Sequence, residues 1–293
     1  MNRFIRLRLL AMLLCLPFLL IFISGCGSSS QKKDEPPVYS PLQVLVPEAT
    51  GKETLGSSPM ILDVSNISQG YFIAQSDSSD LTCSLQIITP SGVLYSYFIA
   101  PGESATITFT EGSGDYTITG YQQVQGDQYA ALYSETVTVQ LENNFLPFLY
   151  PNQYVNFTPD SKASQLALSL IDEDTVDVDA LQQIYDYVVS NLTYDYEKAD
   201  TVTTGYLPDV DETLKTGTGI CFDYAALTTA MLRSCDIPCK LQIGYAGDIK
   251  HAWIDVYIRS KGWVNQAVSF KGDTWTLMDP TFDSNSDDKE AIQ

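Results

Sequence analysis

The chain has 293 residues, 44% of them hydrophobic and 18% charged, which is typical of a globular protein of about two domains. Its 36 acidic and 16 basic residues give a net charge of −20. Such a surface repels phosphate backbones, and the sequence has no basic stripe, which argues against nucleic-acid binding. The single histidine and the lack of a Cys-x-x-Cys pair argue against a metal site, and we expect no cofactor.

The N-terminus has the features of an export signal. A positively charged start precedes an apolar run over residues 9–23, which is too short for a membrane span. The run ends in Ile23-Ser24-Gly25-Cys26, which resembles a bacterial lipobox and implies cleavage before Cys26 and lipidation of its thiol. The alternative is an ordinary signal peptide that is cut nearby. We expect residues 1–25 to be removed, residues 26–56 to form a flexible tether, and the mature protein to lie outside the cytoplasm, anchored to the cell membrane.

Residues 57–145 are expected to form an all-β accessory domain, a small sandwich or barrel. Short runs of alternating apolar and polar residues recur there, and turns rich in proline and glycine separate them. No catalytic constellation is evident in this region, and its tyrosines are expected to pack between strands. The expected strands are residues 60–64, 70–74, 85–88, 93–99, 105–109, 116–121 and 135–141.

Residues 146–293 are expected to form a second domain of the α+β class, with helices first and then an antiparallel sheet. The apolar spacing predicts a helix over 161–170 and another over 181–192 with Asp177 or Asp179 as its N-cap. A loop over 200–219 then leads to a helix over 221–234. That helix is apolar on nearly every side, which predicts a place in the centre of the domain. The expected strands are residues 240–245, 251–258, 263–268 and 274–278.

Cys221, His251 and Asp279 occur in an order that suits a nucleophile, a base and an orienting carboxylate. Cys221 is expected in the first turn of a helix, where the helix dipole and the free N–H groups favour a thiolate. His251, the only histidine of the chain, is expected at the head of a strand, where it can accept the thiol proton. Asp279 follows the last strand and can fix the orientation of the imidazole. Each residue alone is weak evidence, and their order and local contexts together carry the prediction.

The sequence around these positions resembles the bacterial transglutaminase-like superfamily, which is related to papain-type cysteine proteases. The resemblance covers roughly residues 150–285 and rests on three blocks: Gly219-Ile220-Cys221-Phe222-Asp223-Tyr224-Ala225-Ala226-Leu227, His251-Ala252-Trp253 and Asp279-Pro280-Thr281. It implies Cys221 as nucleophile, His251 as base and acid, and Asp279 as orienting carboxylate. One departure is Cys235, where the family often has glycine, and it concerns the local turn.

The resemblance implies acyl transfer from a carboxamide or peptide bond of a protein or peptide substrate. The alternatives are a cysteine protease or amidase that acts on cell-wall or exported peptides, and a surface binding or assembly module without turnover. Tyr224 and Trp253 are further candidates for the cleft, with packing as the other interpretation. Cys235 and Cys239 either form a disulfide across a turn or remain small buried thiols.

Overall fold

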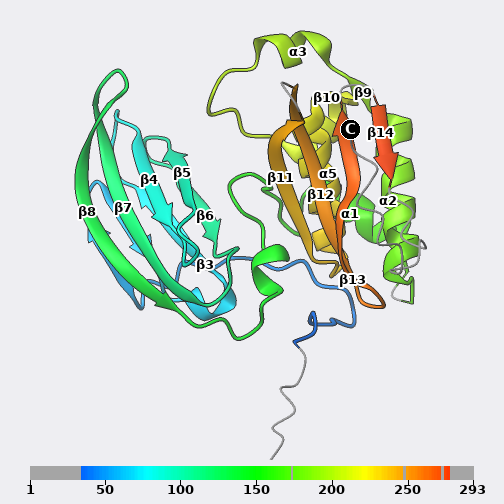
Figure 1. Ribbon diagram of the computed structural model, residues 1–293, viewed down its shortest axis with the longest axis horizontal. Coiled ribbons are helices and arrows are strands. Elements are labelled where there is room, and N and C mark those ends of the chain that lie inside the picture. The colour runs from blue at the N-terminus through cyan, green and yellow to red at the C-terminus, as the bar shows by residue number, and fades with distance from the viewer. Residues whose placement is uncertain (1–33, 173, 247–248, 272–273, 278–293) are drawn as a thin grey trace, which may run out of the picture. The chain divides into compact units, whose positions relative to one another are not determined.

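The structure, a computed structural model, describes residues 34–172, 174–246, 249–271 and 274–277 (Figure 1). The chain divides into two compact units, Met1–Lys33 and Asp34–Gln293, and all described residues belong to the second. The expected signal peptide, Cys26 and Asp279 lie outside the described residues. Within the described part of the chain, no helix has both the length and the apolar character needed to cross a bilayer.

Residues 54–139 form the expected β-sandwich. Apolar side chains of both sheets, such as Leu62, Phe72, Leu85 and Ile118, share one buried core. The first sheet has the antiparallel order β1-β2-β3-β6, with strands β1 (Thr54–Ser57), β2 (Met60–Asp63), β3 (Tyr71–Ser76) and β6 (Ser104–Thr108). The second has the antiparallel order β5-β4-β7-β8, with strands β4 (Cys83–Ile88), β5 (Leu94–Ile99), β7 (Gly114–Gln125) and β8 (Gln128–Val139). A 3-10 turn, η1 (Ile67–Gln69), precedes β3.

The sandwich departs from the sequence prediction at two places. Strands β7 and β8 are longer than expected, because their pairing continues through polar residues that bond across the hairpin, such as Thr119 and Ser134 with hydroxyl oxygens 2.9 Å apart. Strand β1 was not expected at all. It contains Gly56, where a Cβ would lie 2.6 Å from the ring of Tyr133, so only glycine lets the two pack.

The prediction of a flexible tether over residues 26–56 is wrong from residue 34 onward. Val44 and Leu45 are only 6% and 7% exposed, because they join two of the hydrophobic clusters of the fold. The Tyr39 backbone N–H donates a hydrogen bond of 3.1 Å to the carboxylate of Asp236. Although this segment is mostly polar and contains prolines, its few apolar residues pack into the hydrophobic clusters of the fold and hold the segment there.

The C-terminal region combines helices with a four-stranded antiparallel sheet and confirms the α+β prediction. After a 3-10 turn, η2 (Leu146–Phe148), the helices are α1 (Lys162–Leu170), α2 (Asp177–Asn191), α3 (Tyr196–Thr201), α4 (Val210–Thr216) and α5 (Cys221–Ser234). The short strands β9 (Thr193–Tyr194) and β10 (Thr218–Gly219) pair in parallel. The sheet has the order β11-β12-β13-β14, with strands β11 (Cys239–Ala246), β12 (Ile249–Ile258), β13 (Gly262–Lys271) and β14 (Thr274–Leu277).

Helix α5 occupies the centre of this region, as its apolar composition predicted. Every residue from Asp223 to Ser234 is buried. The helix contacts β11, β12 and β13 on one side and α1, α2 and α4 on another, and Figure 1 shows it behind the sheet. Near its end, the Arg233 guanidinium donates to the carbonyl of Tyr150 at 2.7 Å and to that of Cys239 at 2.8 Å. These bonds fix the C-terminal end of the helix.

Two helix boundaries differ from the prediction. Helix α2 begins at Asp177, with Val176 as its N-cap, so neither Asp177 nor Asp179 caps it. Asp177 instead binds Arg259, whose Nη1 lies 2.5 Å from the Asp177 Oδ1. The expected loop over 200–219 contains α4, which Asp209 caps by accepting hydrogen bonds from the backbone N–H groups of Asp211 and Glu212.

Cys235 and Cys239 are free and buried, so the disulfide considered for this pair is not formed. The Cys239 sulfur lies 3.5 Å from the Thr229 hydroxyl on α5. Burial raises the pKa of each of the two thiols to about 12. These thiols therefore pack as small apolar groups and are poor nucleophiles at neutral pH.

Candidate active site

Cys221 is the first residue of α5, as predicted. The N-cap residue is Ile220, and its backbone N–H donates a hydrogen bond of 2.8 Å to the carboxylate of Asp223, the third residue of the helix. This leaves Cys221 at the positive end of the helix dipole, where a thiolate is stabilised. Cys221 is also partly exposed, whereas the other described cysteines are buried. Position and access together mark Cys221 as the thiol suited to react with a substrate.

His251 lies on β12, two residues after the start of the strand. The prediction placed it at the strand head, but the pairing of β11 with β12 continues to Ala246 and Ile249. His251 is only 7% exposed, and the Trp253 ring lies beside the imidazole with centroids 5.9 Å apart and an angle of 30° between the planes. Trp253 itself covers Gly244, where a Cβ would lie 2.8 Å from the indole. Trp253 therefore supports the imidazole from one side.

Cys221 and His251 line the same cavity, which has a volume of about 280 Å³. Two of the three residues predicted for catalysis thus come together, and Asp279 lies outside the described residues. None of the described residues that line the cavity carries a carboxylate, an ammonium or a guanidinium group. The other lining residues are Tyr194, Ala199, Val202, Thr203, Thr204, Gly205, Tyr206, Ile220, Phe222, Ile243 and Ala252.

A larger cavity of about 370 Å³ shares Ile243 with the first but includes neither Cys221 nor His251. Its walls come from β5, β6 and the loop after β6, from residues 148–155, and from α5 and β11. Because a catalytic cavity must contain the reacting groups, the smaller cavity is the candidate active site.

Tyr194 is a site residue that the sequence analysis missed. In the parallel pairing of β9 with β10, it lies opposite Gly219, two residues before Cys221. The backbone of Cys221 forms a hydrogen bond with the Tyr194 hydroxyl. Burial raises the pKa of this hydroxyl, and the nearby Cys221 sulfur raises it further. Tyr194 therefore keeps its proton at neutral pH and can donate a hydrogen bond into the cavity that it lines.

Tyr224, predicted as a cleft candidate, does not line the cavity. It lies one turn into α5, is 0% exposed, and belongs to the hydrophobic core of the C-terminal region. Burial raises the pKa of its hydroxyl. The side chain is therefore packed in the core and is not presented to the substrate. Trp253 is likewise absent from the described lining, and it contacts the site through the ring of His251.

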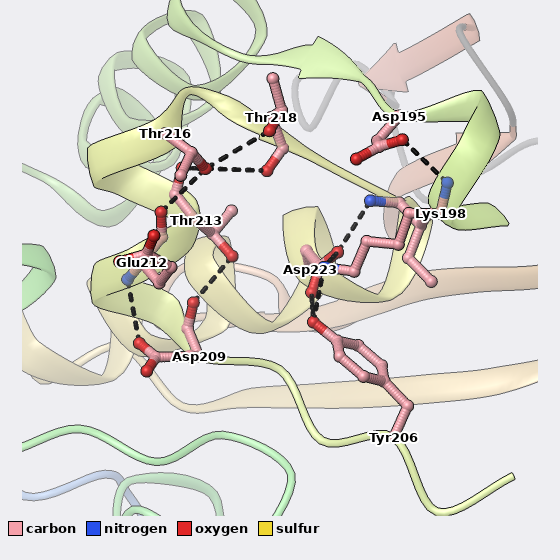
Figure 2. Close-up of polar contacts among 10 residues, drawn as sticks. Asp195, Lys198, Tyr206, Asp209, Glu212, Thr213, Thr216, Thr218 and Asp223 are labelled. Carbon is pink, nitrogen blue, oxygen red and sulfur yellow. Dashed lines mark hydrogen bonds and ion pairs between the residues drawn. The ribbon is translucent and has the colours of Figure 1, made fainter. Parts of the chain in front are cut away.

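A second feature that the sequence analysis missed is a polar cluster beneath the start of α5 (Figure 2), made of Lys198, Tyr206 and Asp223. The Lys198 ammonium lies 2.7 Å from the Asp223 carboxylate and 2.7 Å from the Tyr206 hydroxyl. The Tyr206 hydroxyl also donates to the Asp223 carboxylate. Burial lowers the pKa of Lys198, but the hydrogen bonds to Asp223 and Tyr206 outweigh it and the net shift is upward. Burial and the bond to Asp223 raise the pKa of Tyr206 to about 12.

The family match covers part of the C-terminal region, and the matches to solved structures cover a larger share of the chain. Residues 164–280 match the transglutaminase-like superfamily, and no curated protein matches the sequence. A solved structure of a provisionally assigned cysteine protease from Cytophaga hutchinsonii is 18% identical, with a TM-score of 0.35, over 75% of this chain and 78% of that one. A provisionally assigned protease from Parabacteroides distasonis is 15% identical, with a TM-score of 0.31, over 69% of this chain and 43% of that one. Cys221, His251 and Asp279 fall inside the matched range, so the chain is similar to the transglutaminase-like superfamily over the region that contains all three.

Proposed function

We propose that the protein is a thiol-dependent acyltransferase or hydrolase that acts on a carboxamide or peptide bond through Cys221, His251 and Asp279. The observation that carries this proposal is the cavity shared by Cys221 and His251, in which the one partly exposed thiol of the described residues meets the only histidine of the chain. The match of residues 164–280 to the transglutaminase-like superfamily supports the same reaction class.

In the proposed reaction, His251 takes the proton of the Cys221 thiol, and the sulfur attacks the carbonyl carbon of the substrate. The carbon–nitrogen bond then breaks, and the imidazolium returns the proton to the leaving ammonia or amine. Water or a second amine, deprotonated by His251, resolves the thioester and regenerates the thiol. Asp279 is assigned as the carboxylate that orients the imidazole, by analogy with other thiol and serine triads.

The negative charge that develops on the substrate oxygen needs hydrogen-bond donors. The backbone N–H of Cys221 is at the start of α5, and it donates a hydrogen bond to the Tyr194 hydroxyl oxygen. The Tyr194 hydroxyl is hydrogen-bonded to the Cys221 backbone and lines the cavity. We assign these two groups as the oxyanion donors: the Tyr194 O–H can point to the substrate oxygen while its oxygen accepts from Cys221, and the Cys221 N–H exchanges that bond for the oxyanion when the carbonyl is attacked.

The proposed setting is the outer side of the cell membrane. The N-terminal apolar run and the sequence before Cys26 support export and lipidation at Cys26. The substrate is then an exported protein or a cell-wall peptide. Because the described cavity wall has no charged side chain, the group that enters beside Cys221 should be neutral, as a carboxamide or a backbone amide is.

The proposal is tested first by thiol reactivity. Brief treatment with iodoacetamide at neutral pH, followed by peptide mass spectrometry, should modify Cys221 before Cys83, Cys235 and Cys239, and the variant His251→Ala should slow the modification of Cys221. Equal rates at all four thiols in the folded protein contradict a catalytic role and favour a binding or assembly module.

The second test separates the reaction types. Ammonia release from glutamine-containing peptides is measured with and without a primary amine, for the unaltered protein and for Cys221→Ala. Incorporation of the amine indicates a transferase, release without incorporation an amidase, and cleavage of the peptide backbone a protease. Turnover that survives Cys221→Ala contradicts the proposal.

A further inference from the structure

The first turn of α5 contains a buried ion pair that the proposed chemistry does not use directly. Asp223 is 0% exposed and lies two residues after Cys221. Its carboxylate accepts from the Ile220 backbone N–H at 2.8 Å, from the Lys198 ammonium at 2.7 Å, and from the Tyr206 hydroxyl. Three elements therefore meet at one buried carboxylate: α3, the loop before α4, and the start of α5 (Figure 2).

The carboxylate has a local benefit and a local cost. It accepts the backbone N–H of Ile220, the N-cap residue just before Cys221. A negative charge in the same helical turn also disfavours the thiolate that the reaction needs, since like charges raise the pKa of an acid. The Lys198 ammonium offsets this charge, because it is in direct contact with the Asp223 carboxylate.

Tyr206 connects the ion pair to the wall of the cavity. Its hydroxyl bonds to both charged groups, and its side chain lines the cavity together with Cys221. The Lys198 ammonium also lies 4.5 Å from the centroid of the Tyr206 ring. The wall segment 199–206 is thus attached to the start of α5 through Lys198 and Asp223.

Other ionisable groups surround the start of α5 and act on the same thiol. His251 from β12 and Tyr194 from β9 line the cavity with Cys221. Tyr196 and Asp200 from α3 lie close enough to Tyr194 to affect its pKa. Lys198 is the positively charged residue that, among the described residues, forms an ion pair with the first turn of α5.

We propose that Lys198 is a positioning residue for Cys221: its ammonium neutralises Asp223, so that the carboxylate can cap α5 without opposing the thiolate, and it fixes the cavity wall through Tyr206. The inference rests on the proposed function, because it assigns a role in the activation of the same thiol.

The test measures the rate of Cys221 alkylation by iodoacetamide between pH 5 and pH 9, with no substrate present. Lys198→Met should slow the reaction at pH 7 by about tenfold and move the rate profile to higher pH, because an uncompensated carboxylate then opposes the thiolate. Lys198→Arg should keep most of the rate. In Lys198→Met/Asp223→Asn, the charge is removed and an amide oxygen can still accept the Ile220 N–H, so most of the rate should return.

Lys215→Met is the matched control. Lys215 forms an ion pair of the same 2.7 Å length with Glu212 on α4, but both side chains are largely exposed. This variant should react like the unaltered protein. Circular dichroism of all variants checks that the fold is kept.

The outcomes separate the two claims. If Cys221 of the unaltered protein is alkylated fast and Lys198→Met does not change that rate, this inference is overturned and the proposed function stays intact. The same holds if Lys198→Met/Asp223→Asn reacts no faster than Lys198→Met, since the residue then acts through packing and not through charge. A Cys221 in the unaltered chain that reacts no faster than the buried thiols overturns the proposed function and this inference with it.

Discussion

Gly219 and Asp223 are in such close contact that a Cβ at Gly219 would lie 2.7 Å from the Cβ of Asp223 and 3.1 Å from its Oδ2. The carboxylate that caps α5 thus occupies the space that any other side chain at position 219 would need. Gly219 is buried and lies next to the start of the helix.

Gly219→Ala should therefore displace Asp223 and disturb the first turn of α5. We expect a loss of roughly 1–3 kcal/mol in the free energy of unfolding, the usual cost of overpacking, and a clear decrease in the alkylation rate of Cys221. Urea unfolding and iodoacetamide kinetics measure the two effects. Thr218→Ala, at the exposed neighbouring position, is the control. If Gly219→Ala keeps both the stability and the alkylation rate of the unaltered protein, the contact between positions 219 and 223 is not constrained.

Gly244→Ala should displace the Trp253 ring from His251. The added methyl group would lie 2.8 Å from the indole, and a shift of the imidazole by about 1 Å can lower kcat/KM by about 100-fold. The double variant Gly244→Ala/Trp253→Phe, with a smaller ring, should recover part of the activity. If the single variant keeps full kcat/KM, Trp253 does not position the imidazole.

Tyr194→Phe separates the oxyanion role from the activation of the thiol. Alkylation by iodoacetamide forms no oxyanion, so its rate at Cys221 should change little. Turnover of an amide substrate should fall by about 10²–10³-fold, the usual cost of one lost oxyanion donor. A variant that loses both rates equally would indicate that Tyr194 serves only to hold Cys221.

Asp236→Asn tests the pH dependence of stability. Burial raises the pKa of Asp236 to about 6 in the folded protein, although the Tyr39 N–H and Arg259 oppose the shift. The unfolded value is about 3.9, so the stability from this group is present below about pH 4 and is lost as the pH rises through about 6.

The asparagine variant should therefore be more stable than the unaltered protein at pH 7, by roughly 1–3 kcal/mol, and equally stable at pH 4. Asparagine also tolerates the positive φ of 58° at this position. Urea unfolding at the two pH values measures the difference. Asp127→Asn, at an exposed site, should change neither curve, and a stability difference that does not depend on pH would contradict the assignment.

The sequence predicted α5 and the place of Cys221 because a glycine-containing loop is followed directly by an apolar run. It did not predict α3 and α4, which have 6 and 7 residues and so have no repeated apolar face. Both begin at an aspartate cap, Asp195 and Asp209. The spacing from Asp209 to Glu212 is a known start signal, but the surrounding glycine, proline and threonine residues favoured a loop.

The contacts of Lys198 and Tyr194 could not be derived from spacing. Lys198 and Asp223 are 25 residues apart and meet only because β9 pairs with β10, which brings the segment before α3 next to the start of α5. Strands of two residues leave no periodic pattern in a sequence. The docking of residues 34–53 was missed for a similar reason, since Val44 and Leu45 are two apolar residues in a polar segment.

The burial of α5 on all sides has a consequence for how new specificities can arise in this protein. Almost any substitution from Asp223 to Arg233 alters a packed core and lowers the free energy of unfolding. The wall residues 199–206 are partly or fully exposed, yet several of them face the same cavity as Cys221. A library for directed evolution should therefore vary this wall, with Lys198 and Tyr206 kept, because altered substrate preference can be selected there while the core stays intact.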